Sequence, residues 1–287
     1  MSARRTSEVL AAAAAALARA GVASPRVDAE LLAAAVLGVP RGRLAVLDEF
    51  PPDALARFDE LVARRAAREP LQHLIGVAGF RYLELAVGPG VFVPRPETEL
   101  LAGWGIAQAR GLPTPTVVDL CAGSGAIALA VAHEVPAARV VAVEADPAAL
   151  RWLRRNAEAR AAAGDRPIEV VAADVTAPEL LAELVGQVDV LLCNPPYVPE
   201  GTPVPPEVAE HDPPQAVFAG ADGLAVIRPV VARAGALLRS GGVVGIEHDE
   251  THAVTVPELL TADGRFGEVT GHRDLTGRPR FATARRR

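Results

Sequence analysis

The stretch that decides the fold is TVVDLCAGSG, residues 116–125. A run of strand-forming residues ends there in a turn with two glycines, and an alanine-rich helical segment follows at 125–134. Glycine lets a backbone turn tightly and approach a ligand, and the start of a helix offers free N–H groups. This order of strand, turn and helix predicts one unit of a nucleotide-binding α/β sheet.

The same alternation continues along the chain. Short apolar runs predict strands, with helical patterns between them, the longer helix being capped by Asp146. Because the runs are continuously apolar, we expect a Rossmann-like, mostly parallel sheet covered by helices on both faces, with ligands at the carboxyl ends of its strands. The predicted strands are residues 116–120, 139–144, 168–172, 188–193 and 243–247, and the predicted helices are 125–134 and 147–163.

Acidic residues lie at the carboxyl ends of the first three of these strands. Glu144 can accept both hydroxyls of a ribose, and Asp174 or its neighbour Val175 lies where an adenine amino group could be bound. The glycine spacing also fits a nicotinamide dinucleotide enzyme. Asp119 favours a cationic sulfonium ligand instead, because a pyrophosphate would repel its carboxylate. The candidate cofactor residues are therefore Asp119, Cys121, Ala122, Gly123, Ser124, Gly125, Glu144, Asp174, Val175 and Asn194.

The fourth strand ends in Asn194-Pro195-Pro196-Tyr197. The two prolines fix φ and leave their carbonyl groups free to accept hydrogen bonds, and Asn194 is kept extended because a proline follows it. The Asn194 side-chain oxygen and the Pro195 carbonyl can together bind the two hydrogens of a planar –NH2 group, while Tyr197 stacks on its plane. The motif predicts transfer of a methyl group to such a nitrogen, helped by positioning and fixed dipoles, with no metal and no strong base.

The composition of the chain and the spacing of its apolar residues also limit how it can be organised. Residues 1 to about 75 have helical periodicity, with Thr6 or Ser7 as a possible cap of the first helix. Ser24 is a predicted cap followed by Pro25 at the first helical position, and Pro51-Pro52-Asp53 is expected to open another helix. Residues 77–87 alternate like a hairpin. The net charge of −6 differs from that of a basic nucleic-acid binder, and no apolar run of about 18 residues predicts a membrane span. We expect a cytoplasmic monomer.

Several features have less specific interpretations. The alanine-rich start is expected to be a helix, although a signal peptide can look similar. Cys121 and Cys193 are expected to be buried free thiols. His248 and His252 have a spacing that could hold a metal, but a polar loop is the favoured interpretation. Residues 285–287 are expected to be a frayed, solvated tail.

Together these motifs resemble the release factor glutamine methyltransferases, the PrmC/HemK family, over nearly the full length. The residues that carry the resemblance are 69–76, 89–99, 123–128, 194–197, 219–224 and 274–278. The Pro-Arg-Pro-Glu-Thr-Glu stretch at 94–99 discriminates best, because Asn-Pro-Pro-Tyr also occurs in adenine-specific DNA methyltransferases. Cys121 and Ala122 stand where the family more often has Gly and Thr. The first change is conservative if Cys121 has an ordinary φ. Glu144 replaces the commoner Asp.

The resemblance implies a class I S-adenosylmethionine-dependent methyltransferase. Its parts would be an N-terminal helical bundle at 1–76 that binds the substrate protein, a hairpin linker at 77–94 and a seven-stranded catalytic domain at 95–287. It implies S-adenosyl-L-methionine as cofactor, and peptide chain release factors 1 and 2 as partners, methylated on the glutamine of their Gly-Gly-Gln loop. The roles of Arg95, Glu97 and Thr98 stay open between helix capping with domain docking and closure of the cofactor pocket.

The main alternative is a DNA or RNA adenine N6-methyltransferase that uses the same motif. Such an enzyme is expected to have a basic groove and usually a target-recognition domain, whereas this chain is acidic and its extra domain is small. A nicotinamide dinucleotide oxidoreductase leaves residues 194–197 unexplained. A helical interaction module with a degenerate catalytic domain is disfavoured by the intact Asn194 and Tyr197.

Overall fold

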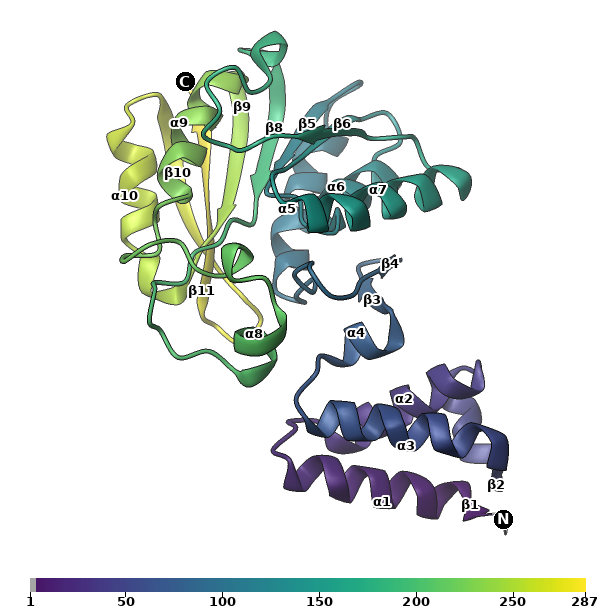
Figure 1. The fold of residues 1–287 in the computed structure, drawn as a ribbon. Helices are drawn as coiled ribbons and strands as arrows, with labels where there is room; N and C mark the ends of the chain where they lie inside the picture. Colours follow the sequence, from purple (N-terminus) through teal and green to yellow (C-terminus); the bar gives the residue numbers. More distant parts are fainter. Residues whose placement is uncertain (1–3) are drawn as a thin grey trace. The chain divides into compact units, whose positions relative to one another are not determined.

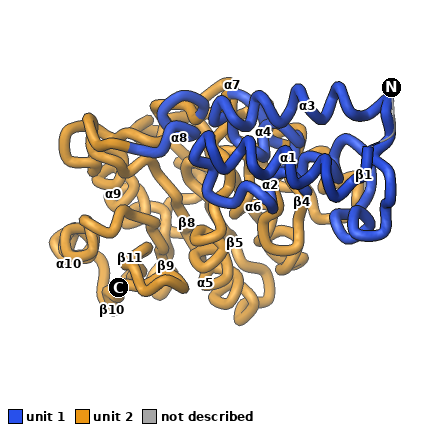
Figure 2. The backbone as a smooth tube through the Cα atoms, turned by 90° about the horizontal axis from the view of Figure 1, so that it is seen from below, with its two compact units in different colours: residues 1–77, 87–89, 204–211 blue, residues 78–86, 90–203, 212–287 orange. Residues whose placement is uncertain are grey.

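The computed structural model describes residues 4–287, which form two compact units (Figures 1 and 2). Among the described residues, no helix is long and apolar enough to cross a membrane. Unit 1 contains the chain up to Val77 and two short later segments, Val87–Pro89 and Val204–His211. Unit 2 contains Ala78–Ala86, Gly90–Pro203 and Asp212–Arg287.

Unit 1 is helical, as the periodicity predicted. Its buried core includes Leu17, Leu32 and Phe58. Pro25 occupies the first position of a helix, as predicted, and another helix begins at Pro52, within the predicted Pro51-Pro52-Asp53 opening. Neither Ser24 nor the start of the first helix provides a side-chain cap. Thr6 is buried and its N–H donates to the carbonyl of Asp48, so the predicted cap was wrong. The elements are β1 (Arg4–Arg5), α1 (Thr6–Arg19), α2 (Pro25–Leu37), a 3-10 helix (Arg41–Val46), β2 (Glu49–Phe50), α3 (Pro52–Ala66), α4 (Leu71–Ile75) and α8 (Pro206–His211).

Charged groups hold α8 within unit 1. The buried Arg65 donates to Asp28 Oδ2 at 2.8 Å and to Glu207 Oε1 at 2.9 Å. Arg68 donates to both oxygens of Glu207, at 2.9 and 2.7 Å. Burial would raise the pKa of Glu207, but the hydrogen bonds from Arg68 and Arg65 outweigh it and lower that pKa to about 2. Glu207 therefore stays ionised and anchors the segment that follows the 194–197 loop in the chain.

Unit 2 is built on a seven-stranded sheet, as expected for the class I methyltransferase fold. The sheet order is β10-β11-β9-β8-β5-β6-β7. All neighbours from β9 to β7 pair in parallel, and β11 is antiparallel to both β9 and β10. The strands are β5 (Thr116–Leu120), β6 (Arg139–Glu144), β7 (Glu169–Ala172), β8 (Val188–Cys193), β9 (Leu238–Glu247), β10 (Phe266–Arg273) and β11 (Pro279–Arg286). A separate hairpin pairs β3 (Val77–Phe80) with β4 (Leu83–Ala86), as the alternation predicted.

The strand order reverses between β5 and β8. From β5 the chain proceeds to β6 and β7 on one side, and then returns to β8 and β9 on the other side. Leu120 and Cys193 are register partners at this point, so the glycine turn and the Asn194 motif leave the sheet side by side. A ligand crevice is expected at such a switch point.

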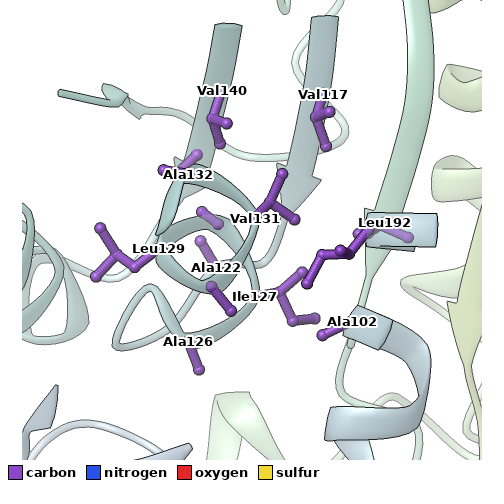
Figure 3. Packing of buried hydrophobic residues seen from close by; sticks show 14 of the residues in the cluster. Ala102, Val117, Ala122, Ala126, Ile127, Leu129, Val131, Ala132, Val140 and Leu192 are labelled. Carbon is purple, nitrogen blue, oxygen red and sulfur yellow. The ribbon is translucent and has the colours of Figure 1, made fainter. Parts of the chain in front are cut away.

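Helices cover both faces of the sheet (Figure 1). On one face, side chains such as Val117 and Leu192 pack against α5 (Thr98–Arg110), α6 (Ala126–Glu134) and α7 (Pro147–Ala162), and Figure 3 shows part of this cluster around α6. On the other face, alternate residues such as Val118 and Cys193 pack against α9 (Ile227–Leu237) and α10 (Thr255–Ala262). Burial on both faces explains the continuously apolar strands. Short 3-10 helices cover Ala182–Leu184, Pro214–Ala216 and Glu250–His252.

The end of the chain differs from the prediction. Residues 285–287 are not a frayed tail, because Arg285 and Arg286 belong to β11, which lies between β9 and β10 in the sheet. Arg285 pairs with Val243, and Arg287 N donates to Arg265 O at 2.9 Å. An arginine-rich sequence can form an interior strand here because the long side chains of Arg285 and Arg286 reach carbonyl groups of Gly241 and Gly235.

Candidate active site

The turn after β5 has a left-handed backbone at three positions. Cys121, Gly123 and Gly125 have φ values of 59°, 56° and 88°. A Cβ on Gly125 would lie 2.6 Å from Leu153 Cδ1, so a side chain is excluded there, whereas a Cβ on Gly123 would have nothing within 4 Å. Open space beside Gly123 is what close approach of a ligand requires. Cys121 does not have the ordinary φ on which a conservative replacement of Gly depended, so the change is not conservative: a side chain is held where glycine would be unstrained.

Glu144 closes this turn from the end of β6. Its Oε2 accepts a 2.8 Å hydrogen bond from Gly123 N–H, and its Oε1 accepts from the N–H groups of Ala145 and Asp146, both at 2.8 Å. Burial raises the pKa of Glu144, and these three backbone donors act in the opposite direction. The carboxylate therefore shapes the glycine turn itself, a role that the sequence did not indicate.

Asp119 lies one residue before the end of β5 and is only 1% exposed. Its Oδ2 accepts a 3.0 Å hydrogen bond from Ala128 N–H in the first turn of α6, which ties the strand to the helix across the glycine turn. Its Oδ1 is buried and has no hydrogen-bond partner within residues 4–287. Burial raises the pKa of Asp119 to about 8. An orphaned buried carboxyl oxygen beside the turn fits a cationic ligand, which would favour its ionised form.

The remaining candidate cofactor residues have mixed environments. Asp174 is exposed, and its Oδ1 accepts from both the N–H and the hydroxyl of Thr176. The hydroxyl and N–H of Thr176 lower the pKa of Asp174. Val175 is buried in the core, as are Ala122 and Ser124 in the glycine turn. Among these four residues, only Asp174 exposes its side chain freely at the carboxyl edge of the sheet.

Asn156 of α7 supports the same turn from outside. Its Nδ2 donates to Ser124 O at 2.9 Å and to Ala86 O at 3.0 Å, while its Oδ1 accepts from Ala86 N–H at 2.8 Å. The side chain is buried and therefore bridges the glycine turn and strand β4. It was not among the residues singled out in the sequence, because a lone Asn in a helix carries no local signal.

The motif residues follow β8. Asn194 is half-buried, and its Nδ2 donates to the hydroxyl of Thr98 at 3.1 Å. Pro195 is buried and Pro196 is half-buried. The Tyr197 hydroxyl donates to Glu247 Oε1 at 3.2 Å, and burial, with Glu247 nearby, raises the pKa of Tyr197. Both ends of the motif are thus held by side chains from other elements.

The segment 217–224 packs directly on the motif loop. Val198 forms a bridge with Phe218, and Ala219 N–H donates to Val198 O at 3.0 Å. Gly223 has φ 71°, and a Cβ on it would lie 2.3 Å from the carbonyl oxygen of Tyr197. This contact gives a physical reason for the glycine at position 223 in the 219–224 stretch.

The histidines near the end of β9 are interior residues. His248 and His252 are 1% and 6% exposed, and His252 Nε2 donates to the carbonyl of Asp222 at 2.9 Å. The expected polar loop is therefore a packed support beneath the 219–224 segment. Within residues 4–287 no cluster of three His, Cys, Asp or Glu has the geometry to hold a metal ion. Cys193 is a buried free thiol as expected, and Cys121 is only partly buried.

Comparison with known proteins agrees with this geometry. The model of the PrmC N-terminal domain matches residues 8–76, and that of the methyltransferase small domain matches residues 106–210. A release factor glutamine methyltransferase of Mycolicibacterium smegmatis is 58% identical over 276 residues, with 96% of this chain and 95% of the relative covered. The chain belongs to the release factor glutamine methyltransferase family. The Streptomyces coelicolor member is 52% identical, with 94% of each chain covered.

Two further similarities extend beyond release factor glutamine methyltransferases. A 4-amino-L-phenylalanine/4-methylamino-L-phenylalanine methyltransferase of Streptomyces pristinaespiralis is 42% identical, over 85% of this chain and 82% of its own. Among solved structures, the T. thermophilus 16S rRNA N2 methyltransferase RsmC, in complex with AdoMet and guanosine, has a TM-score of 0.51 at 25% identity. This match covers 74% of this chain and 50% of RsmC. The methyltransferase fold of unit 2 is thus shared across different substrates.

Two residues that contact the motif were not identified as such from the sequence. Thr98 was considered only for capping, domain docking or closure of the cofactor pocket, and Glu247 was assigned no role. The register Cys193↔Ile246 places the next residues, Asn194 and Glu247, at adjacent strand ends, a relationship that only the sheet pairing reveals. The Thr98 signal was present in the stretch 94–99, but its partner lies 96 residues away.

Proposed function

We propose that this chain transfers a methyl group from S-adenosylmethionine to the side-chain amide nitrogen, N5, of the Gly-Gly-Gln glutamine in bacterial release factors 1 and 2. One observation carries the proposal most: Asn194 Nδ2 donates to Thr98, so Oδ1 is the end of the amide directed away from that partner. Asn194 follows Cys193, the register partner of Leu120, and the glycine turn begins directly after Leu120. The site for the glutamine amide and the site for the methyl donor would then be adjacent.

The proposed cofactor site is the carboxyl edge of β5, β6 and β7. The open space beside Gly123 and the buried, unpaired Oδ1 of Asp119 fit an adenosyl sulfonium with an amino-acid tail. Glu144 would hold the ribose and keep the glycine turn closed, and Asp174 or Val175 would contact the adenine. The turn residues 121–125 would approach through their backbone. S-adenosylmethionine, when bound, supplies an electrophilic methyl group.

The acceptor is proposed to be held by the motif. A carboxamide nitrogen is a poor nucleophile because its lone pair is delocalised. Asn194 Oδ1 and the Pro195 carbonyl would accept its two N–H groups, Pro196 would keep the backbone rigid, and the Tyr197 ring would stack on the amide plane. These contacts aim the nitrogen in line with the methyl group and raise its electron density. The new N–C bond would form as the S–C bond of the sulfonium breaks, which leaves neutral S-adenosylhomocysteine, and the nitrogen would afterwards release one proton.

The names of the relatives support the choice of substrate. The relatives at 58% and 52% identity, which align with nearly the whole of this chain, are release factor glutamine methyltransferases. The PrmC N-terminal model covers residues 8–76, the part proposed to bind the release factor. The relative named for 4-amino-L-phenylalanine is a specific reason to test an arylamine, because an aromatic –NH2 is also planar and delocalised.

The test uses the full chain with a labelled methyl donor. Separate reactions contain an unmodified release factor, the same factor with its loop glutamine replaced by alanine, duplex DNA, and 4-amino-L-phenylalanine. We expect label on the unmodified factor alone. Equal label on the alanine variant, or label mainly on DNA or on the arylamine, would overturn the substrate assignment.

A second arm tests the role of the motif. Asn194→Ala should abolish turnover while the Kd for S-adenosylhomocysteine stays within about tenfold, a loss under about 1.4 kcal/mol. Retained turnover would refute the proposed amide clamp. Loss of cofactor binding far beyond tenfold would show that Asn194 serves the donor and not the acceptor.

A further inference from the structure

A short segment that follows α8 is bound at both of its ends by residues from distant parts of the chain. Asp212, which is only 4% exposed, accepts a 2.6 Å hydrogen bond from the guanidinium of Arg95. Three residues later, Gln215 Nε2 donates to Asp146 Oδ2 at 3.0 Å. All four residues belong to unit 2. The segment 212–215 is therefore held from the region before α5 and from the region after β6.

The Arg95 end of the segment is connected to the end of β8. The carbonyl of Arg95 accepts from Thr98 N–H at 3.2 Å, and the Thr98 hydroxyl accepts from Asn194 Nδ2 at 3.1 Å. Asn194 is the residue directly after β8. The Arg95 guanidinium also lies over the ring of Phe92, 4.5 Å from its centroid. The side chain that holds Asp212 is thus itself fixed from a second side.

The Gln215 end of the segment is connected to the glycine turn. Asp146 follows β6 by two residues, and its N–H donates to Glu144 Oε1 at 2.8 Å. The other oxygen of Glu144 accepts from Gly123 N–H, also at 2.8 Å. Asp146 Oδ1 caps α7 by accepting from Ala148 N–H at 2.9 Å, and Oδ2 is the oxygen that accepts from Gln215. This end therefore contacts the turn whose carboxylate is proposed to hold the ribose.

The order of the strands shows what lies between the two ends. In the sheet, β5 lies between β8 and β6, and the glycine turn begins directly after β5. Two strands on either side of a third are about 10 Å apart, and three residues of extended chain span at most about 10 Å. The segment 212–215 can therefore run from the β8 side to the β6 side across the end of β5. Pro213 and Pro214 stiffen it, because each ring fixes its own φ.

We propose that the segment 212–215, the strap, forms an outer wall of the cofactor site and has to open before S-adenosylhomocysteine can leave. This inference rests on the proposed function, because it needs the methyl donor to bind at the carboxyl ends of β5 and β6. It assigns Arg95 to closure of the cofactor pocket, one of the two roles that the sequence left open. Gln215 and Asp212 become residues of that site which no local motif indicated.

The two attachments of the strap differ in strength. The Asp212 carboxylate is buried and is paired with a charged donor, and such a bond is costly to break. Gln215 is exposed and Asp146 is half-buried, and the bond that joins them comes from an uncharged amide. The strap therefore opens at Gln215 and stays attached at Arg95. Because the product has to leave before a new donor binds, the Gln215 hydrogen bond controls the rate of this exchange.

The experiment measures how fast labelled S-adenosylhomocysteine dissociates from the full chain when unlabelled S-adenosylhomocysteine is added in excess. Gln215→Ala removes the weaker attachment and should raise the dissociation rate about 3- to 10-fold, as expected for loss of one hydrogen bond. Gln187→Ala is the matched control. Gln187 is also an exposed glutamine of unit 2 whose Nε2 donates a hydrogen bond, to Glu183 O at 2.7 Å. Its replacement should leave the rate unchanged.

A pair of charge changes separates a specific contact from general destabilisation. Gln215→Glu places a second carboxylate against Asp146 and should speed dissociation more than Gln215→Ala does. Adding Asp146→Asn to that variant supplies an –NH2 group that can donate to the new carboxylate, while its Oδ1 still caps α7. The double variant should return to within about threefold of the unsubstituted rate. A substitution that merely loosened the fold would not be rescued by this second change.

The second readout is amide exchange in the free protein, which does not depend on the cofactor. The N–H groups of Ala216 and Val217 donate to Pro213 O at 2.9 Å and to Pro214 O at 3.1 Å. They should exchange faster in Gln215→Ala and at the normal rate in the Gln187→Ala control. Unchanged exchange in Gln215→Ala would show that this side chain does not hold the strap and would overturn the inference.

The dissociation rates distinguish failure of the strap from failure of the proposed function. Unchanged rates in both Gln215→Ala and Gln215→Glu, or an equal rise in Gln187→Ala, would overturn the strap while the cofactor site stands. Absence of S-adenosylhomocysteine binding by the unsubstituted protein would instead reject the proposed cofactor site, and the role of the strap with it.

Discussion

Gly223 lies directly against the carbonyl oxygen of Tyr197, so closely that a Cβ on the glycine would be 2.3 Å from that oxygen. The glycine also has φ 71°, a conformation that L side chains rarely adopt. The last residue of the motif is therefore supported by a backbone contact that no other residue type allows. This contact and others like it lead to four predictions. Each prediction compares a substitution with another variant that isolates the effect of the contact.

Gly223→Ala should displace the motif loop. We expect it to destabilise the protein by about 1–3 kcal/mol more than Gly277→Ala, because overpacking adds to a shared cost of positive φ. Gly277 has φ 86° but nothing within 4 Å of its ideal Cβ, so it controls for φ alone. Urea unfolding gives the two free energies. Equal losses in the two variants would show that the loop relaxes around the added methyl group without cost.

Substitutions at Cys121 should separate backbone strain from side-chain packing. With φ 59°, Cys121→Gly relieves about 1 kcal/mol of strain and loses a similar amount of packing, so the free energy of unfolding should change little. Cys121→Val places a β-branched side chain at positive φ and should cost about 2 kcal/mol more than the glycine variant. Thermal unfolding of the three proteins tests this. A valine variant as stable as the glycine variant would contradict the left-handed conformation.

Glu144 should matter for the glycine turn through its three backbone hydrogen bonds. Both carboxylate oxygens of Glu144 accept hydrogen bonds from backbone N–H groups. In Glu144→Gln one of these oxygens is replaced by an –NH2 group, which cannot accept, so the hydrogen bonds on that side are lost. We expect the affinity for S-adenosylhomocysteine to fall about 10- to 100-fold, measured by calorimetry. Glu158→Gln, an exposed substitution on α7, is the charge-matched control and should bind normally. Normal binding by Glu144→Gln would remove Glu144 from the proposed cofactor site.

The anchoring of α8 through Glu207 should depend on pH. Because its pKa is lowered to about 2 in the folded protein, the stabilisation by its ion pairs is fully present above its ordinary pKa of 4.5. It is lost as the pH falls from 4.5 toward 2. Glu207→Gln should therefore speed amide exchange in Val204–His211 at pH 6–7, by a local loss of about 1–3 kcal/mol. The difference between the two proteins should shrink below pH 4.

Glu60→Gln is the control for this measurement, since Glu60 pairs on the exposed surface of α3 and such pairs contribute little. Exchange in Val204–His211 should be unaffected by it. Equal protection of this segment in the Glu207→Gln variant would show that the arginine contacts do not hold α8.

The sequence predicted the parallel part of the fold closely. The bounds of β5, β6 and β8 are those expected, and β7, α6 and α7 each differ by one residue, whereas β9 begins five residues before the predicted strand. These strands are buried on both faces, so continuous apolar runs identify them directly. By contrast, β10 and β11 were not identified from their own pattern, because they contain polar and arginine residues whose pairing depends on the sheet beside them.

The local motifs of the site could be predicted from the sequence, whereas its contacts between distant segments of the chain could not. Asn194, Tyr197 and the glycine turn stand out because their chemistry is concentrated in a few adjacent residues. Glu247 and Asn156 do not, because each contacts segments at least 32 residues away in the chain. A single carboxyl or amide gains meaning only from the register of the sheet or from the packing of a helix. The left-handed Cys121 was hidden for a similar reason, since its φ is imposed by the turn.

The pairing of Leu120 with Cys193 has a kinetic consequence. The two loops that would carry methyl donor and acceptor emerge from one central ladder, whose amides should open only with global unfolding and should exchange slowest of all. The spacing between the bases of the two loops is therefore set by the sheet and should change only when the sheet itself unfolds.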